Sequence, residues 1–159
     1  MNFARAVQIL VDACVDFIII GGWSAILHGC PYTTVDLDIC FSRRRENLKR
    51  LATALAPYHP RLRDLPSELP FVWDEATLRN GTVFTLTTDL GILDLLADVA
   101  GVGTYEDALQ HSIVVESFER QVRTLDLRAL ISSKKAAGRP KDLALLRELE
   151  ALLEASEPE

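Results

Sequence analysis

The sequence carries two aspartates separated by a single residue. Asp36 and Asp38 lie in the segment 35–41, where apolar and acidic residues alternate at first. In a β-strand every second side chain points to the same face, so the two carboxylates are expected about 6 to 7 Å apart on one face. Like charges this close are costly without a counter-ion, and carboxylate oxygens are ligands that Mg²⁺ and Mn²⁺ prefer. The pair therefore predicts a site for one of these cations.

A third acid follows in an apolar segment. Asp94 stands between Ile92-Leu93 and Leu95-Leu96, where an unpaired carboxylate would cost several kcal/mol. A nearby cation would remove that penalty. Three carboxylates can hold two cations roughly 3.5 to 4 Å apart, one activating an attacking oxygen and one bound to a triphosphate. The sequence also leaves Asp89 and Asp98 open as the third acid.

Two adjacent glycines precede the acidic pair. Gly21 and Gly22 follow the apolar run 17–20, where a strand is expected to turn into a helix. Glycines at such a turn leave backbone N–H groups free, and the helix dipole points at whatever lies there. A phosphate chain is the natural ligand of this turn.

Together these residues resemble the nucleotidyltransferase superfamily, whose pattern is a hydrophobic residue, Gly, Gly or Ser, a spacer, Asp-x-Asp and a distant third acid. The chain is more closely similar to small nucleotidyltransferases related to abortive-infection and toxin–antitoxin systems. The residues that carry this closer similarity are Gly21-Gly22-Trp23-Ser24, His28-Gly29, Thr34 and the motif in 130–142 that includes Leu130-Ile131, Ala136-Ala137-Gly138-Arg139 and Lys141-Asp142.

The resemblance implies a polymerase-beta-like fold, a Mg²⁺ or Mn²⁺ cofactor, an NTP donor and a catalytic site in which three acids bind the metal. The residues it assigns are Asp36, Asp38 and Asp94 for catalysis and metal binding, and Gly21, Gly22, Ser24, Lys134 and Lys135 for the nucleotide. Ser24 is a candidate for a hydroxyl contact to phosphate, because Gly22 replaces the serine that often follows the first glycine. Lys134 and Lys135 are alternatives for a triphosphate or base contact.

We therefore expect a metal-dependent enzyme that transfers a nucleoside monophosphate from an NTP to a hydroxyl group of RNA, a protein or a small molecule. The alternative is a catalytically inactive nucleotidyltransferase-like module of a toxin–antitoxin pair, which acts by binding a small helical partner protein. An intact acid triad favours the enzyme.

Composition narrows the possible partners and the location. The net charge of −6 argues against broad, sequence-independent binding of duplex DNA. Basic residues nevertheless gather at 43–50 and 134–141, so the sequence allows a local basic surface beside the acidic site. The apolar run 17–20 is far too short to span a bilayer. The three cysteines are widely spaced, and we expect them to be free thiols. We expect a cytoplasmic protein without a membrane segment.

The hydrophobic pattern predicts an α+β fold, with a mixed β-sheet core, flanking helices and a C-terminal helical pair. Residues 1–159 are expected to form one domain, with the α/β core in 1–126 and the helical pair in 127–155. An irregular excursion is expected at 57–80 because of its prolines. The expected helices are 3–14, 23–28, 44–55, 105–109, 127–137 and 140–153, and the expected strands are 17–20, 35–41, 82–88, 92–96, 112–116 and 121–125.

Overall fold

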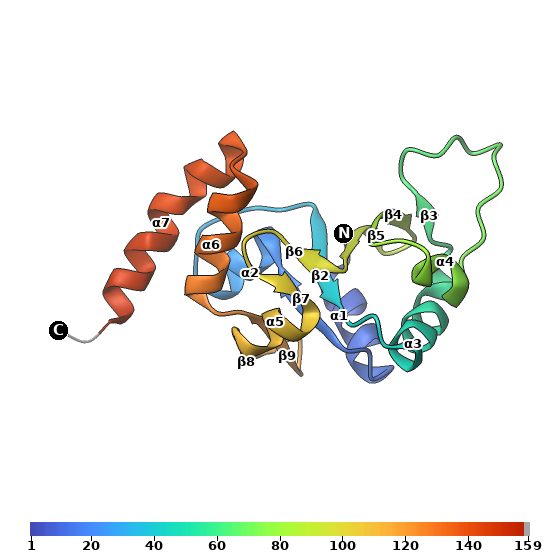
Figure 1. The fold of residues 1–159 in the computed structure, drawn as a ribbon, viewed down its shortest axis with the longest axis horizontal. Helices are drawn as coiled ribbons and strands as arrows, with labels where there is room; N and C mark the ends of the chain where they lie inside the picture. Colours follow the sequence, from blue (N-terminus) through green and yellow to red (C-terminus); the bar gives the residue numbers. More distant parts are fainter. Residues whose placement is uncertain (158–159) are drawn as a thin grey trace.

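The computed structural model describes residues 1–157, which form an α+β fold around a mixed β-sheet (Figure 1), as predicted. The helices are α1 (Phe3–Asp12), α2 (Gly21–Leu27), α3 (Arg45–Leu55), the short 3₁₀ turn η1 (Ala56–Tyr58), α4 (Glu75–Arg79), α5 (Tyr105–Gln110), α6 (Leu127–Ala137) and α7 (Pro140–Ser156). The strands are β1 (Phe17–Ile20), β2 (Asp36–Phe41), β3 (Arg61–Leu62), β4 (Val83–Thr88), β5 (Gly91–Leu96), β6 (Asp98–Val99), β7 (Gly103–Thr104), β8 (Ser112–Ser117) and β9 (Arg120–Leu125).

Seven of these strands form one sheet in the order β3-β4-β5-β2-β1-β9-β8. The pairs β2 with β5 and β1 with β9 are parallel, and the other neighbouring pairs are antiparallel. Strand β2 lies in the middle, so it has a hydrogen-bonded neighbour on each side. A central strand is held in register by both neighbours, and its side chains are therefore fixed relative to theirs.

Alternation along β2 separates a core face from a polar face. Leu37 and Ile39 are fully buried in a cluster with residues of α1 and α3. Asp36 and Asp38 point to the opposite face and are partly buried. That second face carries its own apolar cluster farther along the strands, to which α2, α5, α6 and α7 contribute. The helices therefore cover both faces but leave the two carboxylates only partly buried.

The C-terminal helical pair turns sharply between its two helices. The Asp126 side chain accepts a hydrogen bond from the Ala129 N–H and so caps the start of α6. Gly138 ends α6 in the left-handed conformation at φ 65°, and Pro140 opens α7 at its first position. Figure 1 shows α6 and α7 at one end of the molecule and the loop between β3 and α4 at the other.

The predicted excursion at 57–80 is only partly irregular. It contains η1, the two-residue strand β3 and the helix α4. The small β6–β7 pair was also not predicted. Among the described helices, none combines the length and the apolar composition that crossing a bilayer requires.

Candidate active site

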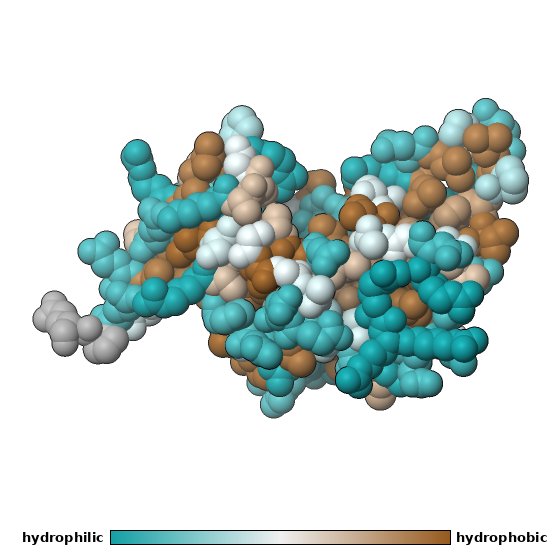
Figure 2. All heavy atoms as spheres, viewed as in Figure 1, coloured by the Kyte–Doolittle hydropathy of each residue, from teal (hydrophilic) through white to brown (hydrophobic). Residues whose placement is uncertain are grey.

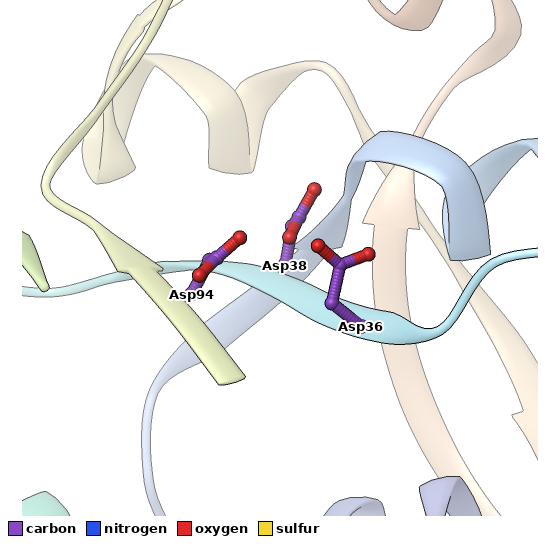
Figure 3. A group of neighbouring side chains, drawn as sticks. All are labelled: Asp36, Asp38 and Asp94. Carbon is purple, nitrogen blue, oxygen red and sulfur yellow. The ribbon is translucent and has the colours of Figure 1, made fainter. Parts of the chain in front are cut away.

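Three aspartates meet on the polar face of the sheet. Asp38 lies directly opposite Asp94 in the parallel pairing of β2 with β5, and Asp36 lies two residues earlier on β2. One carboxylate oxygen from each residue lies within 4.8 Å of those of the other two. Figure 3 shows the three side chains projecting to the same side of the two strands. The structure thus brings together the three acids that the sequence singled out, although they lie up to 58 positions apart in the chain.

Asp38 and Asp94 are poorly solvated. Oδ1 of each is buried without a hydrogen-bond partner among the described residues. Burial raises the pKa of Asp38 to about 8, and the negative charge of Asp36 adds to the rise. Burial likewise raises the pKa of Asp94. Unpartnered carboxylate oxygens grouped this closely fit a divalent cation such as Mg²⁺ or Mn²⁺, which binds hard oxygen ligands.

The third carboxylate of the group is oriented by a neighbour. The hydroxyl of Thr34 donates a hydrogen bond to Asp36 Oδ1 at 2.8 Å. Thr34 precedes Asp36 by two residues, just before β2 begins. The hydrogen bond holds one oxygen of Asp36 and leaves the other available to a ligand. The sequence indicated Thr34 only as part of a motif and did not predict this contact.

Gly21 and Gly22 lie where β1 meets α2, against the acidic group. A Cβ at Gly21 would lie 2.3 Å from Asp38 Oδ2, and the residue has a left-handed φ of +67°. A Cβ at Gly22 would lie 2.7 Å from the Tyr32 ring. A side chain is excluded at Gly21, and one at Gly22 would have to displace the Tyr32 ring. The first N–H groups of α2 begin beside Asp38. Free N–H groups at the start of a helix can bind a phosphate chain.

Ser24 does not lie in the site. Its side chain is fully buried, and its hydroxyl is hydrogen-bonded to that of Thr124 at 2.6 Å. Thr124 in turn donates to the Ile19 carbonyl oxygen at 2.9 Å. Ser24 is on the buried side of the short helix α2 and joins α2 to β9. The prediction of a phosphate contact from its hydroxyl is therefore not kept.

The two candidate lysines differ in position. Lys134 is almost completely buried, and its Nζ donates to Asp142 Oδ1 at 3.1 Å. Lys135 is exposed and forms an ion pair with Glu150 at 3.3 Å. Adjacent residues on a helix point about 100° apart, so only one of them can face the sheet. Lys134 is the one that does so, and Lys135 is not kept as a nucleotide contact.

A basic group lies next to Asp38. Arg139 Nε donates to Asp142 Oδ2 at 2.6 Å, so Asp142 binds Arg139 and Lys134 together. Burial acts to raise the pKa of Asp142, but these hydrogen bonds outweigh it and hold the pKa below its ordinary value. A cavity of about 120 Å³ is lined by Asp38 and Gly21 on one side and by this trio on the other.

Arg139 was not among the predicted site residues. It begins α7 as its N-cap, and the side chain of Asp142 bonds both its backbone N–H and its guanidinium. The grouping of basic residues at 134–141 was the signal in the sequence, but the fold was needed to show which of them face Asp38.

The two alternative third acids lie elsewhere. Asp89, in the turn between β4 and β5, lies 2.7 Å from His59 Nδ1. Asp98 is exposed on β6. Neither belongs to the three-carboxylate group found among the described residues, whereas Asp94 does.

Comparison with known proteins gives the fold. No family model matches the sequence, and no curated protein matches it. Solved structures do match. The lincosamide antibiotic adenylyltransferase LnuA, with lincomycin bound, aligns over 95% of this chain and 96% of its own at 12% identity and a TM-score of 0.63.

Two further structures agree with this result. A putative nucleotidyltransferase from Thermotoga maritima aligns over 95% of this chain and 96% of its own, at 15% identity and a TM-score of 0.55. ANT(2″)-Ia in complex with adenylyl-2″-tobramycin aligns over 98% and 97%, at 19% identity and a TM-score of 0.55. The chain therefore has the nucleotidyltransferase fold, as the resemblance in the sequence predicted.

Proposed function

We propose that this protein is a Mg²⁺-dependent nucleotidyltransferase, which transfers a nucleoside monophosphate from an NTP to a hydroxyl group. The observation that carries the proposal is the meeting of Asp36, Asp38 and Asp94, with unpartnered oxygens, beside the glycine turn at 21–22. The same arrangement suits Mn²⁺ as the cofactor. Since NTPs are abundant in the cytoplasm, we place the enzyme there.

Each part of the site has a role in this reaction. Asp36 and Asp38 would hold the cation, and the N–H groups of Gly21 and Gly22 would bind the phosphates. When bound, Mg²⁺ would neutralise the triphosphate and stabilise the charge that develops during transfer. Asp94 would take the proton of the acceptor hydroxyl, whose oxygen bonds to the α-phosphorus while the bond to the β-phosphate breaks and pyrophosphate leaves.

The basic group at the α6–α7 turn suits the donor. Lys134 and Arg139 line the same cavity as Asp38 and Gly21, at the start of α2. A triphosphate bound at Gly21 would bring its negative charge close to these two side chains. We propose that they contact the phosphates or the base of the NTP.

The names of two neighbouring structures support nucleotidyl transfer in general. One is named an antibiotic adenylyltransferase, and another holds an adenylylated antibiotic. For this chain the acceptor class considered from the sequence was RNA, a protein or a small molecule.

The first test is calorimetric titration of each NTP into the protein with Mg²⁺ or with EDTA. We expect metal-dependent binding of at least one NTP and its loss in the double variant Asp36→Ala/Asp38→Ala. Asp98→Asn is the matched control, because it removes an exposed carboxylate outside the group. If no NTP bound, the proposed enzymatic activity would be rejected and the partner-binding module would be favoured. The next measurement would then be co-purification with a small helical protein.

A further inference from the structure

Paired residues connect the acidic group to an arginine at the edge of the sheet. Asp38 lies opposite Asp94, and Asp94 lies opposite Thr85 on β4. The backbone N–H of Arg63 donates to the Thr85 carbonyl oxygen at 2.9 Å, directly after the short strand β3. A single row across neighbouring strands therefore runs from Asp38 to Arg63, with Asp94 between them.

Arg61 and Arg63 lie near each other but differ in their partners. The Arg61 guanidinium donates to the Leu69 carbonyl oxygen at 3.1 Å and so holds the following loop. Arg63 is exposed, and among residues 1–157 its side chain makes no hydrogen bond or ion pair. Its place in the row puts its positive charge on the Asp94 side of the acidic group.

The cations on the two sides of the acidic group are not equivalent. Lys134 and Arg139 line the Asp38 side, and both are bound to Asp142. Arg63 lies beyond Asp94, toward the opposite edge of the sheet, and is free to bind a ligand. Figure 2 shows a hollow in the molecule between the α6–α7 end and the β3–α4 end. An acceptor entering from the Asp94 side would meet Arg63 first.

We propose that the acceptor carries a phosphate next to its reacting hydroxyl, and that Arg63 binds this phosphate while Asp94 receives the hydroxyl proton. This inference rests on the proposed nucleotidyl transfer and names the acceptor class for it. A guanidinium matches a phosphate in shape and charge and can bind it through two hydrogen bonds. A polycationic acceptor would be repelled at the same position. The 3′ end of RNA and a phosphorylated sugar both have the required chemistry.

The test compares Arg63→Gln with Lys49→Gln and with the unaltered protein. Lys49 is a suitable control because it is an exposed cation on α3, which packs against the other face of the sheet. The probes are an RNA tetranucleotide, the corresponding nucleoside, glucose 6-phosphate, glucose and tobramycin. The readouts are transfer of label from an α-labelled NTP and the affinity for each probe when Mg²⁺ and a non-hydrolysable NTP analogue are present.

We expect a phosphate-bearing probe to bind and to be labelled, and its neutral counterpart to be a much poorer acceptor. Arg63→Gln should weaken that acceptor by roughly tenfold to a hundredfold, as expected for loss of a charged hydrogen bond, and leave NTP binding unchanged. The tetranucleotide and glucose 6-phosphate separate the two sources of the phosphate. Binding of NTP without binding of either phosphorylated probe would overturn the proposal. So would preference for tobramycin, or equal effects of Arg63→Gln and Lys49→Gln. If the unaltered protein bound no NTP, the proposed nucleotidyl transfer itself would be rejected.

Discussion

The substitution Asp38→Asn should make the metal-free protein more stable at alkaline pH. Asp38 is mostly buried among like charges, and its pKa is raised to about 8 from an ordinary value of 3.8. Below about pH 4 the side chain is protonated in both the folded and the unfolded state, so it has no effect. As the pH rises toward 8, the unfolded chain releases this proton and the folded protein keeps it, so the folded state loses stability.

The size of this effect follows from the shift. At about 1.4 kcal/mol per pKa unit, Asp38 lowers the free energy of unfolding by roughly 4 kcal/mol between pH 5 and pH 8. Asparagine has nearly the same shape but does not ionise. We therefore expect Asp38→Asn to abolish most of this loss in the presence of EDTA. The exposed control Asp98→Asn should follow the unaltered protein.

Urea unfolding at pH 5 and pH 8, each with EDTA or with 10 mM Mg²⁺, measures these free energies. Mg²⁺ should restore the stability of the unaltered protein at pH 8, because a cation that binds only the folded state stabilises it by mass action. It should have little effect on Asp38→Asn. Equal pH dependence of the two proteins in EDTA would refute the burial argument, and equal stabilisation by Mg²⁺ would refute the assignment of Asp38 as a ligand.

Three further predictions concern the nucleotide side of the site. Gly21→Ala should lower the free energy of unfolding by about 1 to 3 kcal/mol in urea and abolish transfer, because its Cβ would collide with the Asp38 carboxylate. Gly29→Ala should keep transfer, because Gly29 has a positive φ but open space around it. Lys134→Gln should raise the KM for the NTP at least tenfold, whereas Lys135→Gln should leave it unchanged. Ser24→Ala should lower stability by about 1 kcal/mol through loss of a buried hydrogen bond, with kcat and KM unaltered; a raised KM would show that its hydroxyl reaches the phosphate after all.

The fold could be predicted where local pattern and tertiary packing agree. Alternation in 35–41 predicted a strand with an acidic face, and Gly138 with Pro140 predicted the break in the C-terminal helical pair. The strand β3 could not be predicted, because two residues carry no periodicity and become a strand only by pairing with β4. The same holds for the β6–β7 pair.

The candidate site, like the fold, could be predicted only in part. The grouping of the three aspartates could be predicted because acids in apolar strands are costly without a partner. Ser24 was misjudged because a residue on a helix of seven residues can face either side, and the sequence does not show that Thr124 lies against it. The place of Arg63 in the same row as Asp94 could not be predicted, because it depends on strand pairing across the excursion. Contacts of this kind exist only in the folded chain.

The alternation in β2 also makes assembly of the site inseparable from folding. A slip of one residue in the pairing of β2 would turn both carboxylates under α1 and α3 and expose Leu37 and Ile39. Burial of two charges in that cluster would cost many kcal/mol, so a misregistered strand would not persist. The same six residues specify the core face and the face that carries the acidic group. Recovery of activity during refolding should therefore follow the recovery of native structure, with no folded but inactive form arising from this strand.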